Sequence, residues 1–175
     1  MNKKALLYGL VYAAIVIVFK VYILLSGNAL TKFGYFYSNI TAVFFILPFY
    51  FLLLKAVRKE ESNGLLAGRE AFRLCLSLLA VAVILISVYH YIEFSMYGQE
   101  LAKTYYNSDN FLNFLKTQKN ISADKYATII EEQIKSAGES AFKATTGKLV
   151  SYLFIGISGA FIVSVFMKRG PAKAR

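Results

Sequence analysis

The stretch that decides the fold is AFRLCLSLLAVAVILISVYHYIEF, residues 71–94. Between Arg73 and His90 it holds no charged side chain. A helix rises ~1.5 Å per residue, so about 20 mostly apolar residues cross the ~30 Å hydrocarbon layer of a bilayer. Helices of soluble domains average about 11–12 residues and keep a polar face. The stretch therefore predicts a membrane-spanning helix.

Three further segments of the same character lie on either side of this stretch. They cover residues 5–25, 35–54 and 149–167. Lys20 interrupts the first segment, and Pro48 in the second is expected to kink it. We predict an all-α integral membrane protein, a single domain over residues 1–175 with four transmembrane helices. Strands of a membrane barrel are excluded, because the segments are too long and do not alternate.

The composition agrees with a membrane protein. Of the 175 residues, 57% are hydrophobic and 17% are charged, against roughly 45–50% and 25% in soluble domains. The net charge of +10 would suit nucleic acid, but the basic residues are scattered between apolar runs, so we expect no nucleic-acid partner. The single Cys75 and the single His90 supply too few ligands for a usual zinc site. We expect neither a metal nor a cofactor.

The distribution of basic residues predicts the orientation in the membrane. Every arginine lies in residues 55–73 or in the tail 168–175, and the N-terminus adds Lys3 and Lys4. The long segment 95–148 holds lysines and acids in nearly equal number. Because basic residues are retained on the cytoplasmic side, we predict both termini in the cytoplasm and residues 95–148 outside.

Residues 95–148 are expected to form an amphipathic helical insert. Ser122 is a suitable N-cap, and Tyr126, Ile130 and Ile134 follow at helical spacing, which predicts a helix from Ser122 to about Ser140. A second helix is predicted over residues 109–118. The two apolar faces either pack against each other or lie on the outer membrane surface.

Three local stretches resemble a known family. They are KALLYGL at 4–10, GLLAGREAF at 64–72, and the amphipathic helix that leads to Gly156 and Gly159. Together with four spans and a long insert before the last one, they resemble the bacterial membrane proteins called domain of unknown function 4199. The resemblance implies an inner-membrane (cytoplasmic-membrane) location. It supplies no activity, so no functional residue is carried over.

Polar residues of three different spans are predicted to meet near the outer side of the membrane. This candidate intramembrane cluster comprises Lys20, Asn39, His90 and Glu93. A lone lysine in a span costs roughly 2.5–3.5 kcal/mol at the centre. Lys20 is therefore expected either to pair with Glu93 or His90, or to extend alone to the lipid headgroups. The His90–Glu93 end of its span also fits an ordinary polar helix end.

Small and aromatic residues predict how the helices pack. Small residues recur at four-residue spacing in the first and last spans, which favours packing of these two spans on each other; homodimerisation is the alternative. Tyrosines near span ends, among them Tyr50 and Tyr152, are expected to form an interfacial belt. The small residues are Gly9, Ala13, Gly156, Ala160 and Ser164.

No nucleophile, base and orienting group recur in a catalytic pattern, so we expect a protein that is not an enzyme. The first hypothesis is an envelope protein that contacts membrane lipid and, through residues 95–148, other proteins. The alternative is a small transporter or channel that acts as a homo-oligomer and uses Lys20, His90 and Glu93, since transport sites hold ionisable groups within the membrane.

Overall fold

The computed structural model describes residues 2–26, 44–60, 64–118, 121–138 and 140–167. Every regular element in these ranges is a helix, which confirms the all-α prediction for this part of the chain. The helices in chain order are α1 (Lys3–Leu25), α3 (Ile46–Glu60), α4 (Gly68–Tyr106), α5 (Asp109–Thr117), the short 3₁₀ helix η3 (Ala123–Lys125), α6 (Tyr126–Gly138) and α7 (Ala141–Met167).

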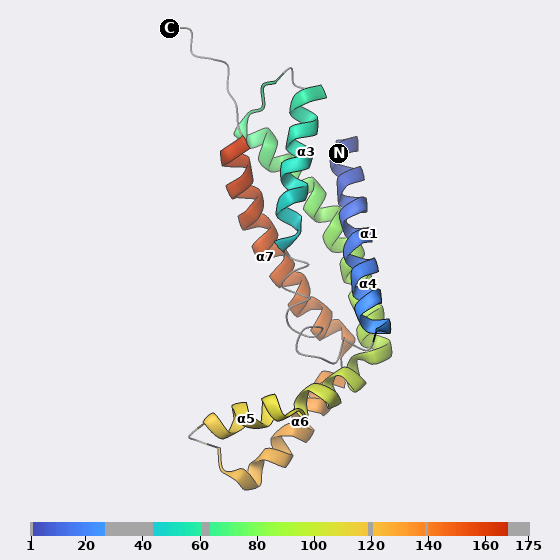
Figure 1. Ribbon diagram of the computed structural model, residues 1–175, viewed down its shortest axis with the longest axis vertical. Helices are drawn as coiled ribbons and strands as arrows, with labels where there is room; N and C mark the ends of the chain where they lie inside the picture. Colours follow the sequence, from blue (N-terminus) through green and yellow to red (C-terminus); the bar gives the residue numbers. More distant parts are fainter. Residues whose placement is uncertain (1, 27–43, 61–63, 119–120, 139, 168–175) are drawn as a thin grey trace.

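The long helix α4 is the centre of the molecule, and α1, α3 and α7 all pack against it (Figure 1). The start of α1, the end of α3 and the end of α7 lie at one end, and α5 and α6 lie at the other (Figure 1). An ion pair between Lys4 Nζ and Glu60 Oε2, at 2.6 Å, joins α1 to α3 at the first end. The start of α1 and the end of α7 therefore lie at the end of the bundle opposite α5 and α6.

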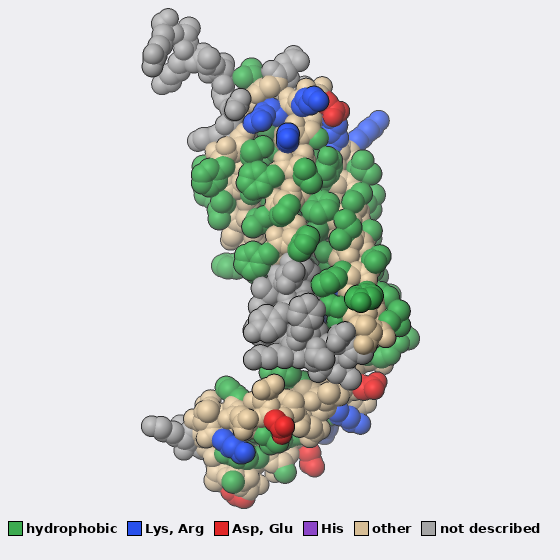
Figure 2. Space-filling model, in the orientation of Figure 1, with side chains coloured by type: hydrophobic (Ala, Val, Ile, Leu, Met, Phe, Trp, Pro, Cys, Tyr) green, Lys and Arg blue, Asp and Glu red, His purple; other side chains and the backbone are tan. Residues whose placement is uncertain are grey.

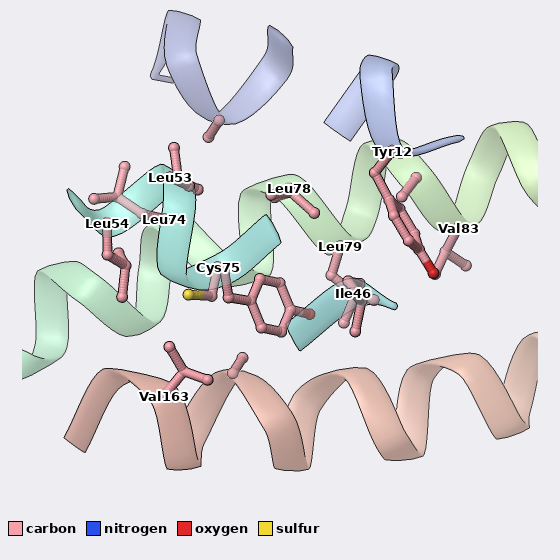
Figure 3. Packing of buried hydrophobic residues seen from close by; sticks show 14 of the residues in the cluster. Tyr12, Ile46, Leu53, Leu54, Leu74, Cys75, Leu78, Leu79, Val83 and Val163 are labelled. Carbon is pink, nitrogen blue, oxygen red and sulfur yellow. The ribbon is translucent and has the colours of Figure 1, made fainter. Parts of the chain in front are cut away.

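The core is apolar and is built around one face of α4. Cys75, Leu78 and Leu79 are buried there, and Figure 3 shows these side chains among those of the neighbouring helices. Tyr12 of α1 and Val163 of α7 are buried in the same cluster. The α4 sequence contributes a buried position about every third or fourth residue, which is the period of a helix face.

Large hydrophobic side chains also cover the outside of α1, α4 and α7 (Figure 2). Val18, Ile84 and Phe154 are examples of such exposed side chains. Soluble proteins rarely expose apolar surface so continuously, whereas lipid-facing helices do. Three of the described helices, α1, α4 and α7, are long and apolar enough to cross a membrane. The chain is therefore a helical membrane protein.

The second expected span is described only in part, because residues 35–43 lie outside the described ranges. Its described part, α3, begins at Ile46 and continues past the expected end to Glu60. Pro48 lies in the first turn of α3, where a proline removes no helical hydrogen bond. Phe44 is helical and Phe45 is a turn residue before α3, so the kink expected in this span stays a prediction.

The helices of two expected spans continue into the predicted insert, residues 95–148. α4 does not end at Phe94 but continues without a break to Tyr106, and α7 begins at Ala141 rather than at Leu149. The sequence becomes polar after Phe94, but polar residues with good helix propensity extend a helix as long as they have something to pack on. Here α6 packs against α4, so the extension has a partner.

Both helices predicted in the insert are present. α5 begins after Ser108, whose side chain accepts a hydrogen bond from the backbone N–H of Phe111, and it ends at Thr117. Ser122 precedes η3 as expected, but its hydroxyl donates to the Asp124 carboxylate and caps no backbone group. The predicted stripe of α6 is only half-buried, because it lies against α4 at the edge of the molecule.

The small residues allow close contacts, but not between the first and last spans. A Cβ at Gly9 would lie 2.9 Å from Leu78 O of α4, and one at Gly156 would lie 2.4 Å from Leu79 Cδ1 of α4. Both outer helices thus pack on α4, and the expected packing of α1 directly on α7 is wrong. Ala13, Ala160 and Ser164 are also buried.

Candidate functional site

His90 and Glu93 form the centre of the candidate site. They lie three residues apart on α4, so both project from one face of the helix. His90 Nδ1 lies 2.9 Å from Glu93 Oε2, and the two residues expose only 1% and 9% of their surface. The hydroxyl of Tyr89 donates to the second carboxylate oxygen, Glu93 Oε1, at 3.3 Å. The carboxylate therefore receives hydrogen bonds on both oxygens, as a buried charge requires.

The contact between His90 Nδ1 and Glu93 determines whether the other imidazole nitrogen, Nε2, accepts or donates a hydrogen bond. Nδ1 must carry the proton in order to donate to the carboxylate. In the neutral ring Nε2 is then an acceptor, and in the imidazolium it is a donor. His90 Nε2 is buried and has no hydrogen-bond partner among the described residues.

Lys20 is brought to this site from α1. It exposes 4% of its surface, so its side chain lies among the helices and not toward lipid. It interacts electrostatically with Glu93 and with His90. Among the described residues, the group that forms an ion pair with Glu93 within 4.0 Å is the imidazole of His90. Direct pairing of Lys20 remains a prediction, and Asn39, the fourth expected member, lies outside the described ranges.

The structure adds Lys148, which the sequence analysis placed at the end of a loop. Lys148 lies inside α7, with Nζ 4.5 Å from the centre of the Phe94 ring. An ammonium at this distance over an aromatic face is held by a cation–π interaction. Lys148 attracts Glu93 and repels both Lys20 and His90. The site therefore contains the amino groups of two lysines and the carboxyl group of Glu93.

Tyr152 and Thr145 complete the site from the same helix. Tyr152 exposes 5% of its surface, and its ring centre lies 6.2 Å from that of His90. Thr145 exposes 9%. The Tyr152 hydroxyl and Thr145 Oγ1 are buried and have no hydrogen-bond partner within the described ranges. Tyr152 does not belong to an interfacial belt, and neither does Tyr50, which is buried and donates to Gly156 O at 3.0 Å.

The missed residues share one signal. Thr145, Lys148 and Tyr152 are spaced by three and four residues, which places them on one face of a helix. Lys148 directly precedes the apolar run 149–167, and a charged residue in that position normally marks the end of a span. The face becomes visible only when α7 is known to begin at Ala141.

The site is a polar cluster buried between three helices. It offers two lysine amino groups, three hydroxyls, one imidazole and one carboxyl group, all drawn from α1, α4 and α7. No group of three or more potential metal ligands from His, Cys, Asp and Glu occurs among the described residues.

Fold and site together define a helical membrane protein with an ionisable cluster buried between its helices. The family described as "Protein of unknown function (DUF4199)" matches residues 5–169. The chain therefore belongs to the DUF4199 family, as its sequence resemblance indicated. No curated protein shows a significant match to the chain, and no solved structure does.

Proposed function

We propose that the chain is a non-enzymatic protein of a bacterial inner membrane that crosses it four times, with both termini in the cytoplasm. Its insert, residues 95–148, contacts another protein outside the membrane. The observation that supports this proposal is apolar surface on the insert and on the helix ends next to it. Large exposed side chains there are Met96, Tyr105, Phe114 and Phe142.

The charges of the insert favour a protein partner over lipid headgroups. A helix that binds a membrane surface is typically rich in lysine and arginine on its polar face. The exposed face of α6 instead carries Glu131 and Glu132 beside Lys135. Exposed apolar side chains surrounded by mixed charges are typical of protein interfaces.

Crosslinking in living cells tests this proposal. A photo-reactive amino acid replaces Phe114, which is exposed on α5, and in a control it replaces Val18, which is exposed on the apolar surface of α1. We expect a discrete protein adduct from position 114 and lipid adducts from position 18. Lipid adducts alone from both positions would contradict the protein contact.

A second function is favoured by the buried cluster. A small transporter or channel, acting as a homo-oligomer, would use Lys20, His90 and Glu93, because ionisable groups inside a membrane protein often mark an ion path. Ion flux into liposomes that contain the purified protein tests this function. Flux that is lost in Glu93→Gln supports it, and flux equal to that of empty liposomes contradicts it.

A further inference from the structure

The end of the bundle opposite the insert carries a strong positive charge. Among the described residues, the start of α1, the end of α3 and the start of α4 hold seven basic side chains and two acidic ones. Figure 2 shows lysine and arginine side chains gathered at this end, whereas both signs of charge are mixed at the other end. The basic residues are Lys3, Lys4, Lys55, Arg58, Lys59, Arg69 and Arg73, and the acidic residues are Glu60 and Glu70.

Short contacts hold these helix ends together. The Lys4 amino group lies 2.6 Å from the Glu60 carboxylate, which joins α1 to α3 and offsets one of the two acids. The backbone N–H of Gly64 donates to Arg58 O at 2.9 Å, so the connection between α3 and α4 folds back on the end of α3. Leu66, in the same connection, is buried in the core. The basic residues of α3 and α4 are therefore fixed at one end of the bundle.

The exposed face of α3 changes from apolar to basic toward this end. Pro48, Leu52, Lys55 and Lys59 are all exposed and recur at spacings of four, three and four, which places them on one helix face. A phospholipid beside such a face has its acyl chain against the apolar residues and its phosphate near the lysines. The face therefore offers each kind of contact at the depth where a lipid molecule needs it.

The first turns of α4 add two arginines. Arg69 and Arg73 are exposed and lie one helical turn apart on one face. A guanidinium binds a phosphate through two parallel hydrogen bonds. In the part of the chain that the structure describes, no ion pair within 4.0 Å joins Arg69, Arg73, Lys55 or Lys59 to an acid. These four side chains can therefore reach an anion outside the chain.

We propose that Lys55 and Lys59 of α3, together with Arg69 and Arg73 of α4, form a basic surface that binds the headgroups of anionic phospholipids. The proposal does not depend on the function of the insert, nor on which side of the membrane this end of the bundle faces.

The position of the basic surface favours a lipid over a nucleic acid or an acidic protein. Its side chains directly adjoin lipid-facing helix surfaces, at the level where the phosphates of a bilayer lie. Leu52 is 51% exposed and lies three residues before Lys55, so apolar and charged contacts are available to one molecule. The anionic phosphate supplies the charge that the surface lacks, whereas a zwitterionic headgroup supplies no net charge.

Native mass spectrometry of the purified full chain in a non-ionic detergent measures this binding. Dioleoyl phosphatidylglycerol and dioleoyl phosphatidylcholine carry the same acyl chains, so the ratio of their Kd values reports the difference between the headgroups. We expect phosphatidylglycerol to bind roughly five- to twentyfold more tightly, which corresponds to about fivefold for each basic group that reaches the phosphate. Higher ionic strength should reduce this preference.

Two double variants locate the binding. Lys55→Gln/Lys59→Gln removes the charges of the α3 face, and Arg69→Gln/Arg73→Gln removes those of the α4 face. We expect either variant to lower the preference for phosphatidylglycerol by roughly threefold or more, because each removes two groups that attract the phosphate. All four side chains are exposed, so the thermal unfolding midpoints of both variants should stay close to that of the wild type.

Lys103→Gln/Lys116→Gln is the matched control, because it removes two exposed charges at the opposite end of the molecule. It should leave the preference unchanged. Equal binding of the two lipids by the wild type would overturn the proposal, and so would an equal loss of preference in all three double variants. Inorganic phosphate in large excess, at constant ionic strength, is the remaining probe. If it displaces phosphatidylglycerol, the surface binds free phosphate and the assignment to lipid is wrong.

Discussion

His90 Nδ1 lies 2.9 Å from Glu93 Oε2 on one face of α4. The pair is buried in a bundle whose other buried residues are mostly hydrophobic. The pair lies beside two lysines from other helices and so ties α1 and α7 electrostatically to α4. Hydrophobic packing alone gives little specificity between helices in lipid, because lipid tails are as apolar as leucine. A polar contact at one height can therefore fix the register of the helices.

Glu93→Gln should destabilise the bundle. The substitution keeps the shape and one acceptor but removes the charge that His90, Lys20 and Lys148 face. We expect a loss of about 1.5–3 kcal/mol, the net contribution of a hydrogen bond to a charged group, measured by unfolding in mixed detergent. Glu60→Gln is the control, because Glu60 is exposed and pairs with Lys4 at the surface; it should change little. Equal effects of both substitutions would contradict a structural role of Glu93.

Gly156→Ala and Gly147→Ala should have opposite effects, although both lie in α7. A Cβ at Gly156 would lie 2.4 Å from Leu79 Cδ1, whereas one at Gly147 meets nothing within 4 Å. We expect a loss of roughly 1–3 kcal/mol at Gly156, from overpacking, and a gain of roughly 0.5–1 kcal/mol at Gly147, from helix propensity. Thermal unfolding midpoints measure both. A gain at Gly156 would mean that α7 does not pack closely on α4.

Ile130→Asp should loosen the insert only moderately. Ile130 is half-buried on α6, so about 1 kcal/mol is expected from lost burial. Limited proteolysis of the insert measures the effect as faster cleavage. Thr128→Asp, at an exposed position of the same helix, is the control. If the two variants are cleaved at the same rate, α6 does not use this face against α4.

Reporter fusions should show the insert and the C-terminus on opposite sides of the membrane. A reporter that is active only outside the cytoplasm is fused after residue 120 and, separately, after residue 175. The basic residues near the ends of α1, α3 and α7 predict activity at 120 and none at 175. The reverse pattern would invert the proposed orientation.

The sequence by itself determined the class of protein and the apolar cores of three of its long helices. Hydropathy over about 20 residues is a local property, because the cost of placing a polar backbone or side chain in lipid is paid residue by residue. For that reason the cores of α1, α4 and α7 were predictable. α5 was predictable too, since its cap at Ser108 and its short apolar face are contained within a few residues.

Only the tertiary structure decided how far the helices continue and what they touch. α4 extends to Tyr106 because α6 packs on it, and α6 is distant in sequence. Gly9 and Gly156 have the same small-residue signal, which shows that a close contact exists but not which helix makes it. Lys148 and Tyr152 enter the site for the same reason. Their positions depend on the antiparallel contact of α7 with α4, and no pattern within either segment specifies the height at which the two helices meet.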